Sequence, residues 1–175
     1  KKSLSGRDID LVEGAARFEG PNQISVDGAK YQAKKIVIAT GSRARRLPIA
    51  GFELAITSDD LLELREQPKS IVFIGAGVIA FEFTHLFARA GTKVTIVEIA
   101  DRPLPHIDAD VVAKLVEATE ALGVEILTGA ETESITAGDG KRIVTVRRGG
   151  AVSTIEAEVV ANGAGRIANV DALDL

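Results

Sequence analysis

The stretch from residue 70 to 97 constrains the fold of this chain more than any other. Residues 70–74 form a continuous apolar run typical of a strand buried on both faces of a sheet, and 93–97 form a second such run. Between them, residues 78–90 repeat apolar side chains at helical spacing, and Gly91 follows where a helix end favours a left-handed residue. A strand, a helix and a strand within about thirty residues predict a βαβ unit with a parallel sheet and a right-handed crossover.

The residues after this unit extend the predicted sheet. Residues 108–122 have the spacing of a second amphipathic helix that ends at Gly123, and 124–127 form a third buried strand. Three short strands separated by glycine-containing turns then follow, at 133–136, 142–147 and 152–156. Residues 159–161 would return the chain to the parallel sheet. We therefore predict an α/β fold, with a Rossmann-like parallel sheet and an inserted antiparallel β-meander.

The first forty residues have a different, β-rich pattern. Residues 17–19 and 23–26 are expected to be short strands, because a Gly-Pro-Asn turn separates them and an Asp-Gly turn follows. Residues 35–39 are a continuous apolar run, and we expect them to form another strand buried on both faces of a sheet.

An arginine cluster marks the connection, residues 43–57, that leads from this part into the βαβ unit. Arg43, Arg45 and Arg46 stand close together in the sequence. They could form a phosphate-binding patch or lie on a solvated crossover between domains, and the absence of interleaved aromatic residues favours the crossover. Ser58 is then expected to be the N-cap of a short helix.

A glycine-rich motif stands between the first strand and the helix of the βαβ unit. The run Gly75-Ala76-Gly77-Val78-Ile79-Ala80 matches the pattern G-x-G-x-x-A. Gly75 permits the tight turn, Gly77 leaves room for a pyrophosphate beside the backbone, and Ala80 lets the helix pack closely on the strand. The motif predicts a dinucleotide-binding loop rather than an ordinary turn, because it follows a strand and opens a helix.

The other two parts of a dinucleotide site are present as well. Val78 and Ile79 open the helix, whose unpaired N–H groups and positive dipole end would face the phosphates. Glu98 ends the next strand about twenty residues after Gly77, where a carboxylate accepts the hydroxyl groups of the adenosine ribose.

The choice between NAD and NADP depends on the residues that follow. Glu98 favours NAD, because a carboxylate repels a 2′-phosphate. Arg102 could approach such a phosphate, but we interpret it as a solvated arginine that pairs with Asp101. The sequence therefore predicts an NAD site.

The composition excludes several classes of site. Cysteine is absent, so the chain has no disulfide, thiolate zinc site, cysteine nucleophile or redox dithiol of its own. The two histidines, His85 and His106, have no further ligand or nucleophile near them in the sequence, so we interpret both as structural or solvent-facing and expect no metal site. The net charge of −4 provides no basic field for a nucleic acid.

Membrane and secretory segments are not expected either. No apolar run approaches the length of about 18 residues that a membrane-spanning helix needs. No secretory signal is visible at the start, and we expect a cytoplasmic location. Lys1 stands where an initiator methionine would be, which favours an internal segment of a longer protein.

Short runs along nearly the whole chain resemble one protein family. In chain order they are 36–42 (IVIATGS), 56–58 (ITS), 74–82 (IGAGVIAFE), 94–98 (VTIVE) and 163–169 (GAGRIAN). They resemble the flavoprotein disulfide reductases, the family of dihydrolipoamide dehydrogenase, glutathione reductase and mercuric reductase.

The resemblance implies an FAD domain that is split in the sequence by an inserted NAD(P)-binding domain with three layers, β/β/α. The expected divisions are the tail of the first FAD-domain segment at 1–47, a crossover linker at 48–57, the NAD(P)-binding domain at 58–161 and the returning FAD-domain segment at 162–175. The implied cofactors are NAD in this chain and FAD in the complete protein. The implied partners are a pyridine nucleotide and the missing FAD and dimerisation segments, in a parent that is a homodimer.

The resemblance also assigns roles to individual residues. Thr40 and Gly41 would lie at a crossover near the flavin, and Gly165 and Arg166 at the return crossover. Glu82 corresponds to the helix glutamate that approaches the nicotinamide in the family. A partly buried carboxylate paired with a cation is an equally open interpretation of Glu82.

The family features that perform the chemistry are missing here. They are the N-terminal FAD-binding glycine motif, the redox-active cysteine pair, the second FAD motif and the C-terminal His-Glu segment. We therefore expect no catalytic residue in this chain and no disulfide reduction by the chain alone. Ala80 in place of a third glycine is a variant found with NADPH-using members of the family. We still predict NAD, because Glu98 would contact the group that differs between the two cofactors.

The predicted function is the NAD(H)-binding part of an FAD-dependent oxidoreductase that passes hydride from the nicotinamide to the flavin. A regulatory NAD-sensing Rossmann domain without catalysis is the alternative, and a domain that binds no nucleotide is a third. The electron acceptor stays open, since lipoamide, glutathione disulfide, mercuric ion and a second pyridine nucleotide are all compatible with this sequence.

Overall fold

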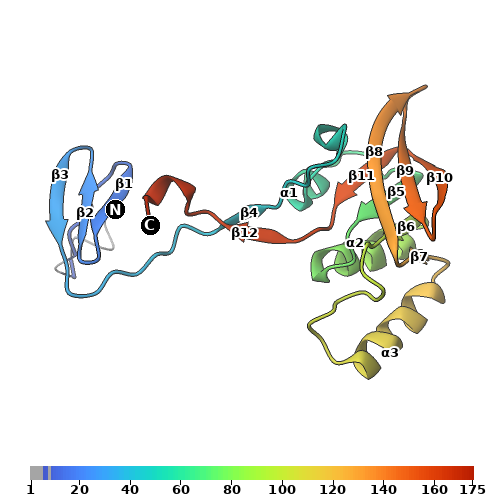
Figure 1. Ribbon diagram of the computed structural model, residues 1–175, viewed down its shortest axis with the longest axis horizontal. Coiled ribbons are helices and arrows are strands. Elements are labelled where there is room, and N and C mark those ends of the chain that lie inside the picture. The colour runs from blue at the N-terminus through green and yellow to red at the C-terminus, as the bar shows by residue number, and fades with distance from the viewer. Residues whose placement is uncertain (1–5, 8) are drawn as a thin grey trace. The chain divides into compact units, whose positions relative to one another are not determined.

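The parallel sheet expected from residues 70–97 is present in the computed structural model, which describes residues 6, 7 and 9–175 (Figure 1). Four strands follow one another in the order β11 (Val159–Asn162), β5 (Ser70–Ile74), β6 (Lys93–Val97) and β7 (Glu125–Leu127). All three neighbouring pairs are parallel. The predicted return of residues 159–161 to this sheet is therefore confirmed.

Helices and antiparallel strands cover the two faces of the parallel sheet (Figure 1). Helices α2 (Val78–Arg89) and α3 (Ala109–Glu120) pack on one face. The other face carries an antiparallel sheet of β8 (Ala130–Gly138), β9 (Lys141–Arg148) and β10 (Ala151–Ala157). The predicted three-layer α/β fold with an inserted meander is confirmed, and the meander strands are longer than their apolar runs indicated.

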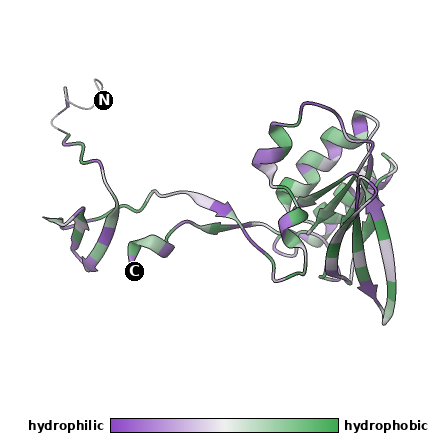
Figure 2. Ribbon diagram, turned by 90° about the horizontal axis from the view of Figure 1, so that it is seen from above, coloured by the Kyte–Doolittle hydropathy of each residue, from purple (hydrophilic) through white to green (hydrophobic). Residues whose placement is uncertain are grey.

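Alternate residues of β5 show why its apolar run is continuous. Ile71 and Phe73 pack in the cluster that includes the helices, whereas Val72 and Ile74 pack in the cluster that includes the meander. A strand covered on both faces needs apolar side chains at every position. The central strands are accordingly hydrophobic along their length (Figure 2).

The connection of residues 43–57 is solvated only in part: Arg43, Arg45 and Arg46 are exposed, as its interpretation as a solvated crossover predicts, but the residues after them are packed. Phe52, in the short 3-10 helix η1 (Phe52–Leu54), is 6% exposed and belongs to the core on the meander side. Ile56 donates its N–H to the carbonyl of Val160 at 2.9 Å, and the carbonyl of Ala50 accepts from Ile135 at 2.8 Å. The sequence could not show these two hydrogen bonds, because the partners of Ile56 and Ala50 are more than eighty residues away in the chain.

Helix α1 (Ser58–Leu62) begins one residue earlier than expected. Its N-cap is Thr57 and not Ser58, since the Thr57 hydroxyl accepts from the backbone of Asp60 while the Asp60 carboxylate accepts from the backbone of Thr57. This reciprocal pair is a capping box and satisfies two N–H groups that the helix leaves free. The Asp60 carboxylate accepts hydrogen bonds from the backbone N–H and the hydroxyl of Thr57, and these lower its pKa.

The chain divides into two units, one of residues 44–166 and one of the residues up to 43 together with 167–175. The second unit contains β1 (Ala16–Gly20), β2 (Gln23–Val26) and β3 (Ala29–Gln32), which pair in antiparallel fashion. The predicted strands and turns of this region are confirmed. Near its end lies a short 3-10 helix, η2 (Asp171–Leu173).

The strand expected at residues 35–39 is not formed. These residues have no regular secondary structure, and the Val37 side chain is 88% exposed. The prediction was wrong because an apolar run of this kind becomes a strand only when neighbouring strands pair with it. None of the described residues supplies such a neighbour.

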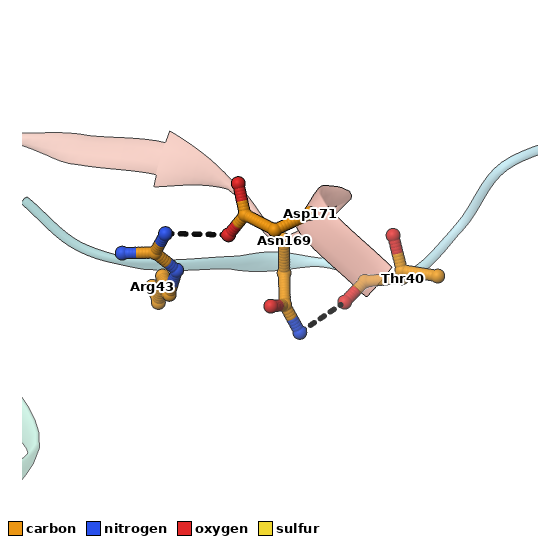
Figure 3. Close-up of polar contacts among 4 residues, drawn as sticks. All are labelled: Thr40, Arg43, Asn169 and Asp171. Carbon is orange, nitrogen blue, oxygen red and sulfur yellow. Dashed lines mark hydrogen bonds and ion pairs between the residues drawn. The ribbon is translucent and has the colours of Figure 1, made fainter. Parts of the chain in front are cut away.

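Two short strands mark where the chain passes between the units. Strand β4 (Ser42–Ala44) pairs with β12 (Arg166–Ala168). Within the smaller unit the Arg43 guanidinium forms an ion pair with Asp171, and the Asn169 amide donates to the carbonyl of Thr40 at 3.4 Å (Figure 3). At the ends of the larger unit, Arg45 donates its N–H to the carbonyl of Gly165 at 3.0 Å.

Candidate functional site

A pocket of about 830 Å³ lies at the carboxyl end of the parallel sheet, inside the unit of residues 44–166. Its floor is the glycine loop of residues 75–77, and Glu98 and Ile99 at the end of β6 form one side. Ligands of open parallel sheets bind at this edge, where the helices begin. The volume lies within the range of about 300–1,000 Å³ of small-molecule and cofactor sites.

Close approach of two backbones explains the glycine loop. Gly75 has a φ of 95°, and a Cβ atom added to it would lie 2.7 Å from the backbone of Ala164. Gly163 donates its N–H to the carbonyl of Ile74 at 2.7 Å, and a Cβ on Gly163 would lie 2.8 Å from the Cβ of Ala80. The loop after β11 thus crosses the glycine loop at a distance that only glycine permits at these positions.

The N-terminus of α2 is open at this loop. Gly77 is its N-cap, no side chain accepts a hydrogen bond from the first turn, and that turn contains no acidic residue. Ala80 is fully buried beneath it. The first N–H groups of the helix are therefore available to an anion, together with the positive end of the helix dipole.

The Glu98 carboxylate also accepts two backbone hydrogen bonds that the sequence did not indicate. One carboxylate oxygen accepts the N–H of Ala76 at 2.7 Å, and the other accepts the N–H of Ala100 at 2.9 Å. The carboxylate therefore ties the glycine loop to the end of β6. Each oxygen has two lone pairs, so each can still accept a hydrogen bond from a hydroxyl group.

Arg102 does not pair with Asp101, and this interpretation was wrong. Its guanidinium donates to three carbonyl groups of its own loop: Pro105 at 2.6 Å, Ile107 at 3.0 Å and Leu104 at 3.5 Å. The sequence could not show this, because backbone acceptors leave no trace in residue identity.

Several residues line the pocket that sequence reasoning missed. His106 is one of them, although its position in a proline-rich loop suggested a structural or solvent-facing side chain. Arg45 lines the pocket as the one member of its arginine cluster that does so among the described residues, and Thr132 lines it from β8. The Thr132 hydroxyl is buried and has no hydrogen-bond partner among the described residues. No spacing rule connects these loops, so no signal in the sequence could have found them.

His85 has the structural role expected of it. Its Nε2 lies 2.8 Å from the hydroxyl oxygen of Thr119, and that hydroxyl donates to the carbonyl of Leu115. Because the hydroxyl proton is already donated, His85 donates through Nε2 and links α2 to α3.

The structure brings some of the expected residues together and not others. Gly75, Gly77, Glu98 and Gly165 line one pocket, whereas Val78, Ile79, Ala80, Glu82 and Arg166 do not line it. Thr40 and Gly41 belong to the other unit. Glu82 is exposed on α2 and has no hydrogen bond or ion pair with a described residue, so the interpretation as a partly buried, paired carboxylate was wrong.

Two other features, a metal site and a membrane-spanning helix, are absent from the described residues. Across residues 6, 7 and 9–175, no group of histidine, aspartate and glutamate side chains is arranged to hold a metal ion. No helix in that part of the chain is long and apolar enough to cross a membrane.

Comparison with known proteins places this geometry in a family. Residues 2–174 match the family described as pyridine nucleotide-disulphide oxidoreductase. The chain is 35% identical over 177 residues to dihydrolipoyl dehydrogenase of Acholeplasma laidlawii, a match that covers 98% of the chain and 52% of that protein. It is 36% identical over 183 residues to soluble pyridine nucleotide transhydrogenase of Mycobacterium bovis, covering 100% of the chain and 38% of that protein.

A solved structure agrees with these matches. The HOCl-induced flavoprotein disulfide reductase RclA from Escherichia coli is similar with a TM-score of 0.79 and 30% identity, over 97% of this chain and 39% of that one. The chain thus spans about half, or less, of the length of these relatives. The family match extends over nearly every residue and includes the glycine loop and Glu98, and the chain belongs to the pyridine nucleotide-disulphide oxidoreductases.

Proposed function

We propose that the chain binds NAD(H) in the pocket at the glycine loop and is the NAD-binding part of an FAD-dependent oxidoreductase. The observation that carries the proposal is that the glycine loop, which includes the N-cap of α2 at Gly77, and the Glu98 carboxylate line one pocket. A dinucleotide site requires a glycine loop that forms the tight turn between strand and helix, a helix N-terminus that binds the pyrophosphate, and a carboxylate that binds the adenosine ribose.

Each element binds a different part of the nucleotide. The uncapped N–H groups of α2 would hold the pyrophosphate, next to a glycine loop that has no side chain in the way. Glu98 would accept from the ribose hydroxyls with the lone pairs that Ala76 and Ala100 leave free. Three carboxylates line the pocket, those of Glu98, Glu131 and Glu133, against one arginine, Arg45, so a 2′-phosphate at Glu98 would meet mainly negative charge. This arrangement supports NAD over NADP.

The chemistry supplied by the bound cofactors is hydride transfer from NADH to the flavin. The flavin does not fit the described residues of the smaller unit, because they contain strands and one short 3-10 helix but no strand, glycine loop and helix that could hold its pyrophosphate. This chain also contains no cysteine and contributes no redox dithiol.

The remaining assignments follow from the family. In the complete protein, Thr40, Gly41, Gly165 and Arg166 would lie at the crossovers to the FAD domain, and the exposed Glu82 would face the nicotinamide. The parent would be a cytoplasmic homodimer that contains FAD. Its electron acceptor would be bound by segments outside this chain.

The test is a calorimetric titration of the chain with NADH and, separately, with NADPH, for the wild type and Glu98→Ala. We expect NADH to bind at least about tenfold more tightly, equivalent to about 1.4 kcal/mol. The informative quantity is the ratio of the two affinities, because Glu98 also holds two backbone N–H groups and its removal loosens the loop for both nucleotides alike.

Glu98→Ala is expected to reduce that ratio to about one, whereas Glu120→Ala leaves it unchanged. Glu120 is an exposed carboxylate at the end of α3, away from the pocket. Tighter binding of NADPH by the wild type would contradict the assignment of NAD, and the binding of neither nucleotide would contradict the proposed function.

A further inference from the structure

We propose that Arg102 is a positioning residue that holds the adenosine side of the pocket in shape and does not itself contact the nucleotide. The inference rests on the proposed function, since it concerns the same pocket. It reverses the usual expectation for an arginine near a ribose site, where the guanidinium would bind a 2′-phosphate.

The loop that follows β6 has one backbone hydrogen bond of its own among the described residues, from the N–H of Ile107 to the carbonyl of Leu104 at 3.0 Å. Pro103 and Pro105 have no N–H group, so two of its positions lack a donor. The guanidinium of Arg102 supplies donors instead, through Nη2 to the carbonyl of Pro105 at 2.6 Å and through Nη1 to that of Ile107 at 3.0 Å and Leu104 at 3.5 Å. A planar group with several N–H donors can join three carbonyls that a single ammonium group cannot reach together.

This loop is connected directly to the binding residues. Leu104, buried and with a φ of 46°, donates its N–H to the carbonyl of Ala76 in the glycine loop at 3.3 Å. Ala76 in turn donates to Glu98. The two residues after Leu104, Pro105 and His106, line the pocket.

The position of the loop therefore determines the shape of one side of the pocket only. That side contains Glu98, the residue expected at the adenosine ribose. The N-terminus of α2, expected at the pyrophosphate, is shaped by the close backbone approach at Gly75, Gly77 and Gly163, and Arg102 makes no direct hydrogen bond to it. Loss of the guanidinium should thus weaken the binding of the adenosine half and leave the nicotinamide half unaffected.

The Arg102 guanidinium already donates to three carbonyl groups of its loop. To bind a 2′-phosphate it would have to give up these hydrogen bonds, and the loop would then lose its support. Arg102 should therefore influence NADH and NADPH by the same factor, which a phosphate contact would not do.

The experiment measures the affinities of Arg102→Ala and Arg102→Lys by calorimetry, with Arg89→Ala as control. Arg89 is an exposed arginine in the last turn of α2. The probes are NADH, NADPH, ADP-ribose and reduced nicotinamide mononucleotide. We expect both Arg102 variants to bind NADH, NADPH and ADP-ribose about tenfold more weakly, and the mononucleotide within twofold of the wild type. Lysine should not rescue binding, because it retains the charge and not the three contacts.

Different results would overturn the inference. A selective loss of NADPH affinity would make Arg102 a phosphate contact, and an equal loss for both half-molecules would make its role one of general stability. Unchanged affinities would show that the loop holds its position without it. If the wild type binds none of the probes, the proposed function fails, and hydrogen exchange at Leu104, His106 and Ile107 still tests Arg102. Faster hydrogen exchange in both Arg102 variants would support its role as a positioning residue, and unchanged exchange would refute that role.

Discussion

The two units of this chain differ in what their apolar residues have to pack against. In the unit of residues 44–166, the central strands are covered on one face by helices and on the other by the meander, and their side chains are almost completely buried. In the smaller unit, Val26 and Leu173 are the large apolar residues that are buried among those described, while Val37 is exposed. Both units have regular strands, and one of them has a core.

This difference shows that local sequence pattern and core formation are separate requirements. The hairpins of β1, β2 and β3 form because turns and alternation are local properties. A small sheet that stands alone has only marginal stability, because it has one apolar face and little to cover it. The stability of the larger unit should therefore respond strongly to substitutions that the smaller unit tolerates.

The largest contrast is expected between two glycines with similar backbone angles. Gly75 and Gly28 have φ values of 95° and 89°, but a Cβ on Gly75 would meet the backbone of Ala164, whereas one on Gly28 would meet open space. We expect Gly75→Ala to cost about 3 kcal/mol or more and to abolish nucleotide binding, and Gly28→Ala to cost about 1 kcal/mol. Chemical denaturation measures both, and equal costs would show that backbone strain and not crowding makes Gly75 necessary.

A matched pair of valines tests the cores themselves. Val94, in β6, is 1% exposed and packs in the cluster on the helix side of the sheet, and Val37 is 88% exposed. The substitution Val94→Ala removes buried methyl groups and leaves a cavity, so it should destabilise the larger unit by about 2 kcal/mol. Val37→Ala should change the free energy of unfolding by less than about 0.5 kcal/mol. A large effect at Val37 would mean that this residue is buried in solution.

The two units should also unfold separately on heating. Tyr31 is the single tyrosine of a chain without tryptophan and lies in β3, so its fluorescence reports on the smaller unit. The α-helices of the described chain all lie in residues 44–166, so circular dichroism at 222 nm reports on the larger one. We expect the tyrosine transition roughly 10 °C below the helix transition, a gap that corresponds to about 1–2 kcal/mol in a unit of this size. Coincident transitions would show that the units unfold as one.

The smallest effect concerns the capping box of α1 and its dependence on pH. The pKa of Asp60 is lowered from its usual value near 3.8 because its carboxylate accepts from the backbone and side chain of Thr57. A carboxylate with a lowered pKa in the folded state stabilises that state above pH 3.8, and the contribution is lost as the pH falls through the folded-state pKa. Asp60→Ala should therefore destabilise the larger unit by about 0.5–1 kcal/mol at pH 7.

The same comparison repeated at low pH serves as its own control. As the pH falls through the folded-state pKa of Asp60, the stabilities of the wild type and Asp60→Ala should converge, because protonation weakens the contact that the variant lacks. A difference that persists undiminished over the whole acid range would show that the neutral side chain caps the helix equally well.

The sequence predicted the parts of the fold whose causes are local. The strands at 70–74 and 93–97 and the helix between them were located to within about a residue, because continuous apolar runs and helical spacing are direct consequences of burial. The run at 35–39 is similarly apolar, but no strand among the described residues lies beside it, and it does not form a strand. Phe52 was missed as a core residue because its partners are distant in the chain.

The site divides in the same manner. The glycine loop and Glu98 were visible because their spacing follows from the geometry of one βαβ unit. The hydrogen bonds of Glu98 to Ala76 and Ala100, the crossing of Gly163 and the position of His106 were not visible. They depend on backbone atoms and on loops from other parts of the sheet, which residue identity does not encode.

The pairing of β4 with β12 has a consequence for how such chains can be recombined. Where residues 44–166 begin and end, Arg45 and Gly165 share a backbone hydrogen bond, and the Asn162 side chain donates to the Arg45 carbonyl at 2.7 Å. A segment whose two ends are already adjacent can be inserted into a surface loop of a host protein with little additional cost in chain entropy. We therefore expect that residues 44–166 can be inserted into a host loop without linkers long enough to span the unit.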